Sequence, residues 1–337
     1  NANVSDYEYG SPIAGSMNYT GHTGNVTLNI SDVLYNGTFD SDGNFIISDI
    51  LPVKEYISTF SFITNEGNYI GNAPVSFNVT NATGSFKITV KDIVYGDNFV
   101  INVTDAVGVN DELLNGTVKV TINSKSYDVS ITNGSGYLIV SDILPKNDYF
   151  VNASLTVSNY DVMESNTSFK VVSTKSSVNF TVEDIDFGDD LVVNGTVSGL
   201  EGAAVPFGNV TIFVNGTERD NVILDSGKFN CSISDLAGGD YNITVRYNGD
   251  NNYNAFNSSA NVTVSPVPAQ SVNITVNTFE YGDDAVVNVT VIGLDGKAVP
   301  SGNVTILVNG TEYDTVPLTD GKCSYTIPAI LDAGDYN

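Results

Sequence analysis

The chain has 337 residues, enough for two to four domains that each bury a core of their own. Its 39 aspartate and glutamate residues outnumber the 13 lysine and arginine residues, so the formal net charge is −26. Because so acidic a surface repels nucleic acid and anionic membranes, neither is an expected partner. No run of residues approaches the ~18 apolar positions that membrane insertion requires.

Three short landmarks recur along the chain in the same order. The first is an aromatic residue followed by glycine, at Tyr9-Gly10, Tyr95-Gly96, Phe187-Gly188 and Tyr281-Gly282. The second is a glycine before a strand-like run, with spacings of 92, 92 and 94 residues, at Gly24, Gly116, Gly208 and Gly302. The third is a leucine with a tyrosine five residues later, at Leu51/Tyr56, Leu144/Tyr149, Leu236/Tyr241 and Leu331/Tyr336. This periodicity predicts four tandem repeats, at residues 1–84, 85–175, 176–268 and 269–337.

The third repeat shows its expected strands most clearly. Apolar and polar residues alternate along short segments, as is typical of half-buried β-strands. Asn215-Gly216 is the preferred pair for a two-residue hairpin turn, because both central residues of that turn have positive φ. The predicted strands are 178–182, 191–198, 209–214, 217–224, 228–233, 241–247 and 260–264. Short strands at this spacing predict an all-β fold, with tandem immunoglobulin-like Greek-key β-sandwich domains in an elongated array.

The connections and the ends of the repeats add two expectations. The linking segments are short, at 80–84, 172–177 and 265–269, and short links between sandwiches predict a semi-rigid rod. The first two repeats diverge most from the pattern. The fourth stops at Asn337, before the last two strands of the pattern. We therefore expect either that the parent chain continues or that a neighbouring chain supplies strands by β-strand addition.

The tyrosine of the third landmark opens the sixth predicted strand of each repeat. A tyrosine corner occupies this place in an immunoglobulin-like sandwich, with the phenol bonded to the backbone a few residues upstream. A plain core aromatic is the alternative, and both roles are structural. The four candidate corner residues are Tyr56, Tyr149, Tyr241 and Tyr336.

The N-glycan acceptor triplet Asn-x-Ser/Thr occurs 24 times among the 41 asparagines. A strand that alternates polar and apolar residues produces such triplets by itself. Asparagine is nevertheless depleted in strands, so its frequency favours N-glycans on the exposed faces. The favoured sites are Asn25, Asn115, Asn209, Asn215, Asn242, Asn261, Asn273, Asn288, Asn303 and Asn309.

Acidic residues follow the aromatic-glycine pairs. Carboxylates at the end of a sandwich could bind structural calcium, and ordinary turn residues are the alternative interpretation. Apart from this calcium and the N-glycans, no cofactor is expected. The metal candidates are Asp97, Asp189, Asp190, Asp283 and Asp284.

Residues suited to catalysis are few. His22 is the single histidine, and its turn-like surroundings predict a solvated side chain. Cys231 and Cys323 occupy different strand positions in neighbouring repeats, which predicts buried, unpaired thiols. No histidine lies in the repeats of either cysteine, so no Cys–His pair is expected there. We therefore predict no catalytic residues and no enzymatic activity.

Three strings of the fourth repeat, 281–283, 299–305 and 333–337, carry a family resemblance, and segment 241–253 of the third repeat completes it. They resemble adhesin-like surface proteins of methanogenic archaea, which carry tandem bacterial-type Ig-like repeats. The resemblance is specific over residues 176–337 and loose over 1–175. It implies secretion, anchoring at the cell surface and a role in attachment, and it brings no catalytic residues.

The sequence thus predicts a non-catalytic structural or adhesive segment of an extracellular, cell-surface glycoprotein. It would act as a stalk or filament-building repeat, and its partners would be copies of itself or other cell-surface molecules. One alternative is a subunit of an extracellular filament or sheath, completed by strand donation between chains. Another is a carbohydrate- or protein-binding module in the first two repeats. The last is the spacer of an enzyme whose catalytic domain lies elsewhere.

Overall fold

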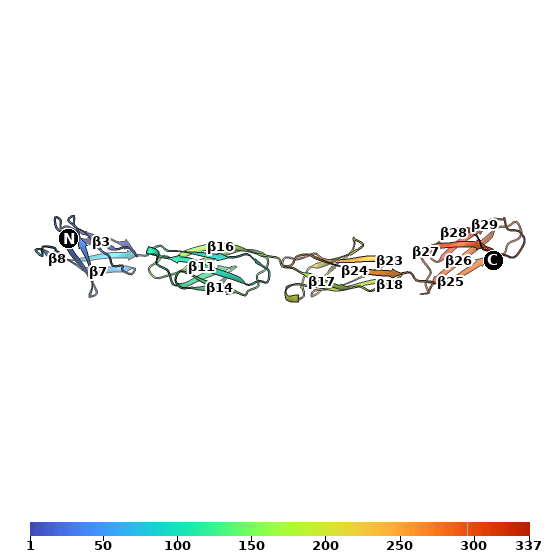
Figure 1. The fold of residues 1–337 in the computed structure, drawn as a ribbon, viewed down its shortest axis with the longest axis horizontal. Coiled ribbons are helices and arrows are strands. Elements are labelled where there is room, and N and C mark those ends of the chain that lie inside the picture. Colours follow the sequence, from blue (N-terminus) through green and yellow to red (C-terminus); the bar gives the residue numbers. More distant parts are fainter. Residues whose placement is uncertain (295) are drawn as a thin grey trace. The chain divides into compact units, whose positions relative to one another are not determined.

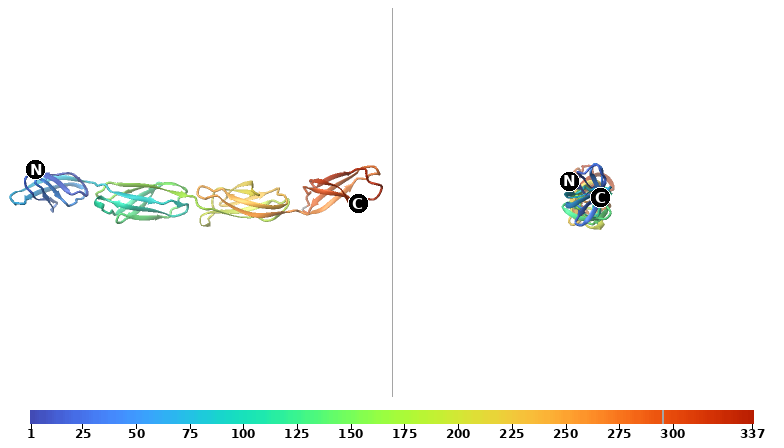
Figure 2. Two further views of the ribbon diagram at one scale, coloured as in Figure 1. Left: turned by 45° about the horizontal axis from the view of Figure 1, so that its top comes forward. Right: turned by 90° about the vertical axis from the view of Figure 1, so that its left-hand side faces the viewer.

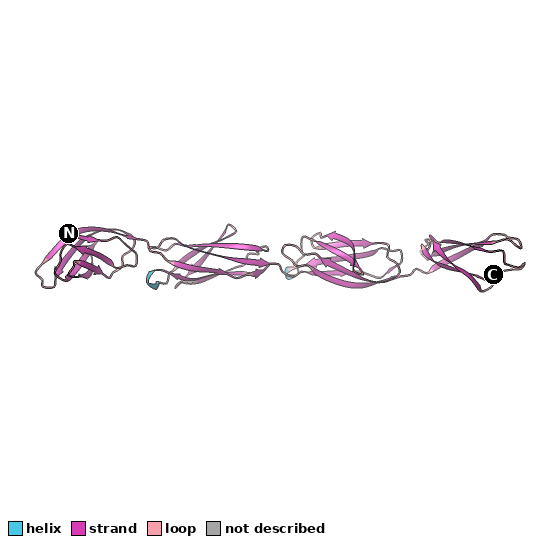
Figure 3. Cartoon of the chain, turned by 90° about the horizontal axis from the view of Figure 1, so that it is seen from above, coloured by secondary structure: helices cyan, strands magenta, loops and turns pink. Residues whose placement is uncertain are grey.

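The computed structural model describes residues 1–294 and 296–337, and these are almost entirely strands and turns (Figure 3). The described helices are two single 3-10 turns, η1 (Val109–Asp111) and η2 (Leu200–Gly202). No helix in this part of the chain is long and apolar enough to cross a membrane. The predicted all-β fold is therefore confirmed.

The chain divides into two compact units. Unit 1 contains Asn1–Thr174 together with Asn251–Tyr253, and unit 2 contains Lys175–Asp250 and Asn254–Asn337. Along the sequence the described strands fall into four groups, each wrapped around its own interior (Figures 1 and 2). We keep the predicted four-repeat division as a proposal and use it to name these groups.

The first repeat, in unit 1, forms one sheet in the order β1-β3-β6-β5-β4-β7-β8-β2. Strand β5 pairs with β4 along its length and with β6 at its end, so the two layers of the sandwich are joined at this edge. The strands are β1 (Ala2–Val4), β2 (Tyr7–Glu8), β3 (Ile13–Met17), β4 (Gly24–Ile30), β5 (Val33–Phe39), β6 (Asn44–Ile47), β7 (Lys54–Thr64) and β8 (Ile70–Thr80).

The second repeat, also in unit 1, has two separate layers. One sheet has the order β10-β16-β15-β12-β13 and the other β14-β11-β9. The strands are β9 (Ser85–Val90), β10 (Ile93–Val94), β11 (Phe99–Val107), β12 (Gly116–Ile122), β13 (Lys125–Ile131), β14 (Gly136–Val140), β15 (Asn147–Leu155) and β16 (Met163–Val172). The two sheets enclose a continuous apolar core.

The third repeat belongs to unit 2 except for Asn251–Tyr253. It has the same two layers, β18-β24-β23-β20-β21 and β17-β19-β22. Its strands are β17 (Ser177–Thr181), β18 (Ile185–Asp186), β19 (Leu191–Ser198), β20 (Asn209–Val214), β21 (Thr217–Ile223), β22 (Lys228–Ile233), β23 (Gly239–Tyr247) and β24 (Phe256–Ser265). All seven predicted strands are present. The sequence missed the short strand β18, and it placed the start of β24 four residues too late.

The fourth repeat forms one sheet in the order β25-β26-β29-β28-β27. Its strands are β25 (Ala269–Val276), β26 (Ala285–Gly293), β27 (Ser301–Val308), β28 (Thr311–Thr319) and β29 (Lys322–Ile327). Every residue of β25 is exposed, whereas β26 buries alternate side chains such as Val287 and Val289.

Alternation along the strands builds each core. In β4 the side chains of Val26 and Leu28 are fully buried, while Asn25 before them and Asn29 after them are exposed. Full burial of one such side chain contributes about 1.5–3 kcal/mol, so a one-residue shift in register would bury the asparagines instead and is strongly disfavoured.

Two kinds of turn recur along the chain, and each kind keeps its own backbone conformation. The hairpin turns after β4, β12, β20 and β27 have positive φ at both central residues, as the pair Asn215-Gly216 predicted, with φ values of 50° and 79° there. The glycine of the aromatic-glycine pair also has a nearly constant φ, at 91°, 97°, 95° and 95° for Gly10, Gly96, Gly188 and Gly282. Such a φ favours glycine because a side chain would be strained.

A short parallel pairing fixes the aromatic residue of each aromatic-glycine pair in the first three repeats. Strands β2, β10 and β18 pair in parallel with the last strand of their repeat. The backbone N–H of the next residue then donates to the same last strand, at 2.9 Å for Tyr9, 2.8 Å for Tyr95 and 2.8 Å for Phe187. The aromatic side chain is thereby held at the end of its repeat.

Candidate functional sites

Each corner tyrosine donates a hydrogen bond to the carbonyl oxygen four residues upstream. The distances are 2.8 Å for Tyr56 to Pro52, 2.8 Å for Tyr149 to Pro145, 2.9 Å for Tyr241 to Ala237 and 2.7 Å for Tyr336 to Asp332. This is the hydrogen bond that a tyrosine corner makes. Burial raises the pKa of Tyr56 and of Tyr149, so both remain protonated donors far above neutral pH.

The five calcium candidates lie in or beside the turns that follow the aromatic residues. The backbone N–H groups of Asp97, Asp189 and Asp283 close these turns, at 2.9–3.1 Å. Two of the carboxylates accept hydrogen bonds from the chain itself: Asp190 from the Ser232 hydroxyl at 3.0 Å, and Asp284 from the Ala329 N–H at 2.9 Å. Over residues 1–294 and 296–337, no three His, Cys, Asp or Glu side chains gather as a metal site would need.

Sequence reasoning missed a different set of acidic residues. Asp6, Asp92 and Asp184 each lie three residues before an aromatic-glycine pair. Their carboxylates accept backbone N–H groups of the last strand, from Asn78 at 2.7 Å, Lys170 at 2.7 Å and Thr263 at 2.8 Å. The recurring position before the pair was the available signal, and its role is to anchor the short parallel strand.

Nine of the ten favoured glycan sites are exposed, and Asn209 is half-buried. The side-chain nitrogen of Asn209 donates to Asn221 at 2.7 Å, and that of Asn242 donates to Asn261 at 3.0 Å. Because a glycan is attached to this nitrogen, these two bonds compete with modification. The better-placed sites are Asn25, Asn261, Asn273, Asn288 and Asn303, which lie on strands with exposed side chains.

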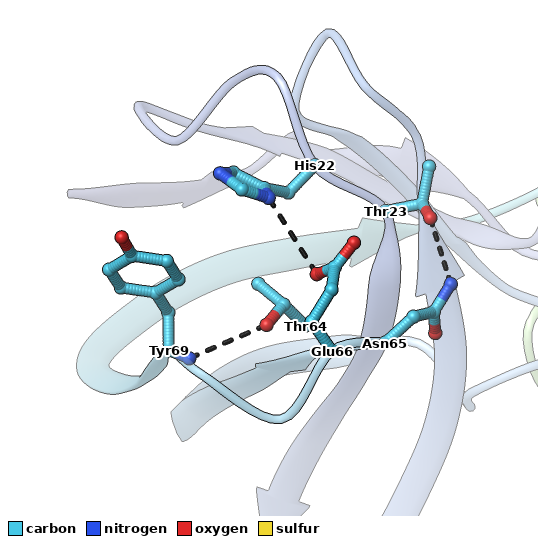
Figure 4. A network of polar contacts seen from close by, with 6 residues as sticks. All are labelled: His22, Thr23, Thr64, Asn65, Glu66 and Tyr69. Atoms are coloured by element: carbon cyan, nitrogen blue, oxygen red, sulfur yellow. Dashed lines mark hydrogen bonds and ion pairs between the residues drawn. The ribbon is translucent and has the colours of Figure 1, made fainter.

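His22 is not the plain solvated side chain that the sequence predicted, because it packs in an aromatic cluster of the first repeat. Its ring stacks on Tyr19 with the centroids 5.3 Å apart, and it lies 5.5 Å from the ring of Tyr69. Its Nδ1 is 3.6 Å from a carboxylate oxygen of Glu66 (Figure 4). Tyr19 and Tyr69 are 50 positions apart in the sequence, so no local pattern could have revealed the cluster.

The loop that carries Glu66 and Tyr69 is held by polar contacts (Figure 4). The Asn65 side-chain amide donates to the Thr23 hydroxyl at 2.8 Å, and the Tyr69 N–H donates to the Thr64 hydroxyl at 3.4 Å. Burial, and then the neighbouring Tyr69, raises the pKa of Tyr19. The cluster therefore places the rings of Tyr19, His22 and Tyr69 beside the Glu66 carboxylate, on a loop that hydrogen bonds hold in place.

The two cysteines are unpaired, as predicted, but they differ in exposure. Cys231 is buried, and Cys323 is half-buried. The Cys231 thiol donates to a carboxylate oxygen of Asp220 at 3.1 Å. Burial and this carboxylate raise the pKa of Cys231 to about 12, so its reactive thiolate is scarce at neutral pH.

Comparison with known proteins supports the fold. The family described as "Bacterial Ig-like domain (group 3)" matches residues 178–265, within the third repeat. The crystal structure of a tetra-tandem repeat in the extending region of a large adhesion protein is similar, with a TM-score of 0.52 and 16% identity. The likeness covers 100% of this chain and 94% of that chain. No curated protein sequence matches the chain.

Two further solved structures are similar at lower TM-scores. A fragment of the ICAM-5 ectodomain, D1–D4, has a TM-score of 0.41 and 13% identity, and covers 97% of each chain. A structure from a 1.5-MDa bacterial ice-binding adhesin has a TM-score of 0.33 and 17% identity, over 79% of this chain and 97% of that chain. The chain is an all-β protein of tandem immunoglobulin-like sandwiches, as its sheets, the family match in the third repeat and the likeness to the tetra-tandem adhesion repeat show.

Replacing Tyr149 by phenylalanine tests the corner tyrosines. The Y149F variant keeps the buried ring and loses the bond to Pro145, so we expect the second repeat to lose about 1 kcal/mol of stability. That corresponds to a fall of about 4–8 °C in its melting temperature. Y137F is the matched control, because Tyr137 is 69% exposed. Equal melting of the two variants would show that Tyr149 acts only as a core aromatic.

The calcium hypothesis is tested by melting the full chain in chelator and in millimolar calcium. We expect the same melting temperature in both, because Asp190 and Asp284 already accept hydrogen bonds from the chain. A calcium-bound native state would instead melt several degrees higher, since a ligand that binds only the folded chain stabilises it by mass action. Magnesium at the same concentration controls for general screening of the acidic surface.

Proposed function

We propose that this chain is a non-catalytic structural segment of an extracellular surface protein, in which tandem sandwiches serve as a stalk. The observation that carries the proposal is the recurrence of the same structural features along the chain. The same aromatic-glycine turn and the same tyrosine-to-carbonyl bond occur in all four repeats. When the buried residues of a unit serve its own packing, repeating that unit along the chain is suited to setting the length of a stalk. The net charge of −26 keeps neighbouring chains soluble and apart.

Attachment to a cell surface is part of the same proposal. It draws on the sequence resemblance to adhesin-like surface proteins and on the similar fold of a repeat from the extending region of a large adhesion protein. In this function the repeats separate an attached end from a distant one and take no part in chemistry.

A second candidate is a filament subunit in which strand donation completes the fourth repeat. A cavity of about 580 Å³ opens there against apolar side chains of β26, β27 and β29. Within the described residues β27 is the outer strand of its sheet and pairs with β28 alone. In the third repeat the corresponding strand β20 pairs with β23 as well as with β21. An added strand with alternating apolar residues would fill this position.

Negative-stain electron microscopy of the purified chain distinguishes the two functions. A stalk predicts separate molecules that each look like a short row of beads. Strand donation predicts regular fibres, whose number grows with protein concentration. As a control, a variant with Leu307 replaced by aspartate puts a charge at the rim of the cavity, on a side chain that is 53% exposed, and it should abolish fibres while leaving isolated molecules folded. Fibres in the unmodified chain would contradict the stalk proposal.

We further propose that the exposed asparagines carry N-glycans in the native protein. Intact-mass measurement of the native chain should show additions in steps of one glycan. Enzymatic removal converts each glycosylated asparagine to aspartate. Aspartate should then be found more often at Asn261 and Asn288 than at Asn209 and Asn242, whose side-chain nitrogens donate hydrogen bonds. A mass equal to that of the unmodified polypeptide would end this proposal. The same chain made in a host without N-glycosylation provides the reference mass.

A further inference from the structure

The loop between β15 and β16 of the second repeat binds the first repeat. The side-chain oxygen of Asn159 accepts the backbone N–H of Val53 at 2.9 Å. The backbone carbonyl of Asn159 accepts the N–H of Ala82 at 3.0 Å, and Ala82 forms an isolated parallel bridge with Tyr160. Ala82 is fully buried. The loop therefore reaches both the preceding repeat and the segment that links the two repeats.

The aromatic residue of this loop completes the contact. The ring of Tyr160 meets the ring of Tyr9 edge-on, with centroids 5.5 Å apart and an angle of 80°. Next to it, a Cβ atom on Gly10 would lie 2.2 Å from Val109, so the glycine of the aromatic-glycine pair is required for close approach. Burial, and then the hydrogen bond to Glu112, raises the pKa of Tyr160 to about 12.

Unit 1 contains the same set of contacts a second time, through the segment Asn251–Tyr253. The side-chain oxygen of Asn252 accepts the N–H of Lys146 at 2.9 Å, and its backbone carbonyl accepts the N–H of Thr174 at 2.9 Å. Thr174 bridges Tyr253 as Ala82 bridges Tyr160. The rings of Tyr253 and Tyr95 meet edge-on at 5.5 Å and 78°.

Both asparagines bind the same peptide group that a corner tyrosine binds. The carbonyl of the Pro52–Val53 peptide accepts the Tyr56 hydroxyl at 2.8 Å, and its N–H donates to Asn159 at 2.9 Å. The equivalent group is the Pro145–Lys146 peptide, with Tyr149 at 2.8 Å and Asn252 at 2.9 Å as its two partners. One peptide is thus hydrogen-bonded both by the tyrosine of its own repeat and by the asparagine of the contacting loop. We call this loop, which contains Asn159-Tyr160 or Asn252-Tyr253, the Asn-Tyr loop.

We propose that the Asn-Tyr loop is a docking element whose partner is the end of an immunoglobulin-like repeat, and that its asparagine is the specificity-determining residue of this interface. The surface that the loop recognises has two parts. One is an aromatic-glycine turn, and the other is the backbone N–H of the residue that follows the carbonyl bound by the corner tyrosine, such as Val53. A residue without a short side-chain acceptor would leave that N–H unpaired at the interface, which disfavours repeats that lack the asparagine.

All four repeats carry the features that the loop recognises. The third has Phe187-Gly188 and the Ala237–Gly238 peptide, and the fourth has Tyr281-Gly282 and the Asp332–Ala333 peptide. In both, the carbonyl of that peptide accepts the corner tyrosine, at 2.9 Å and 2.7 Å. The aromatic-glycine pair and the leucine-to-tyrosine spacing recur together, as a surface recognised by such a loop requires.

Hydrogen exchange of single amides in the full chain tests the proposal. Asn159 has a positive φ of 73°, so we choose Asn159→Gly, which tolerates this backbone but removes the acceptor. The Val53 amide should then exchange on the order of tenfold faster. Asn159→Asp keeps an oxygen acceptor at this position and should restore slow exchange. The parallel variant Asn252→Ala should accelerate the Lys146 amide and leave Val53 unchanged.

Two controls separate docking from folding. Asn166→Ala changes an exposed asparagine of β16 and should alter neither amide. Amides in the middle of β15, such as Val151, should keep their slow exchange in N159G, which shows that the second repeat remains folded. NMR relaxation should also show that the first two repeats reorient more independently in N159G. Unchanged exchange at Val53 in N159G, or equally fast exchange in N159D, would overturn the proposal.

Discussion

The structure depends on one peptide group in the loop before each corner tyrosine. Its carbonyl accepts the tyrosine hydroxyl of the same repeat, which fixes the loop where the chain crosses between the two sheets. In the first two repeats the N–H of that same peptide points outward to an asparagine of an Asn-Tyr loop. Because both polar atoms of the peptide are paired, the end of the repeat presents a defined surface. Packing inside a repeat and recognition at its end are therefore coupled through a single amide.

Several acidic side chains accept hydrogen bonds from the backbone, and few of them form ion pairs in the described residues. Asp6, Asp92 and Asp184 accept main-chain N–H groups of the last strand and so hold the short parallel strand in place. Ion pairs are sparse in the described residues, and the pair between Lys125 and Asp142 at 2.6 Å is the shortest of them. The Lys125 ammonium, followed by the Tyr127 hydroxyl, lowers the pKa of Asp142. Exposed pairs of this kind contribute about 0–1 kcal/mol, so the fold rests on burial and hydrogen bonds.

The first repeat departs from the others in ways that bear on function. Its two layers are joined through β5 and β6, whereas the second and third repeats keep separate sheets. It also carries the cluster of Tyr19, His22 and Tyr69 beside Glu66. The other repeats contain no histidine. The features that the four repeats share support the proposed stalk, and the cluster with the single histidine lies in the first repeat.

The sequence by itself determined most strands of the third repeat and the recurring turns, and it supplied the period on which the proposed four-repeat division rests. Alternation of apolar residues, as along Val26 and Leu28, depends only on neighbouring positions in the chain, and so does the positive φ that Asn215-Gly216 favours. The period also located the four tyrosines that bond to the carbonyl four residues upstream, because the two partners are close together in the sequence. These are local properties, and a linear pattern is sufficient to read them.

Only the tertiary structure decided which residues meet across long separations. Asn159 reaches Val53 over 106 positions, and Asn252 reaches Lys146 over the same number. In the sequence, Tyr9 belongs to a recurring aromatic-glycine pair and Tyr253 to the segment that carries the family resemblance. Neither pattern indicated that the residue would pack against the ring of a distant tyrosine. Likewise the sequence predicted a solvated His22, because the contact of its ring with Tyr69 depends on how two loops converge. Such contacts follow from the geometry of packed sheets, which no spacing along the chain encodes.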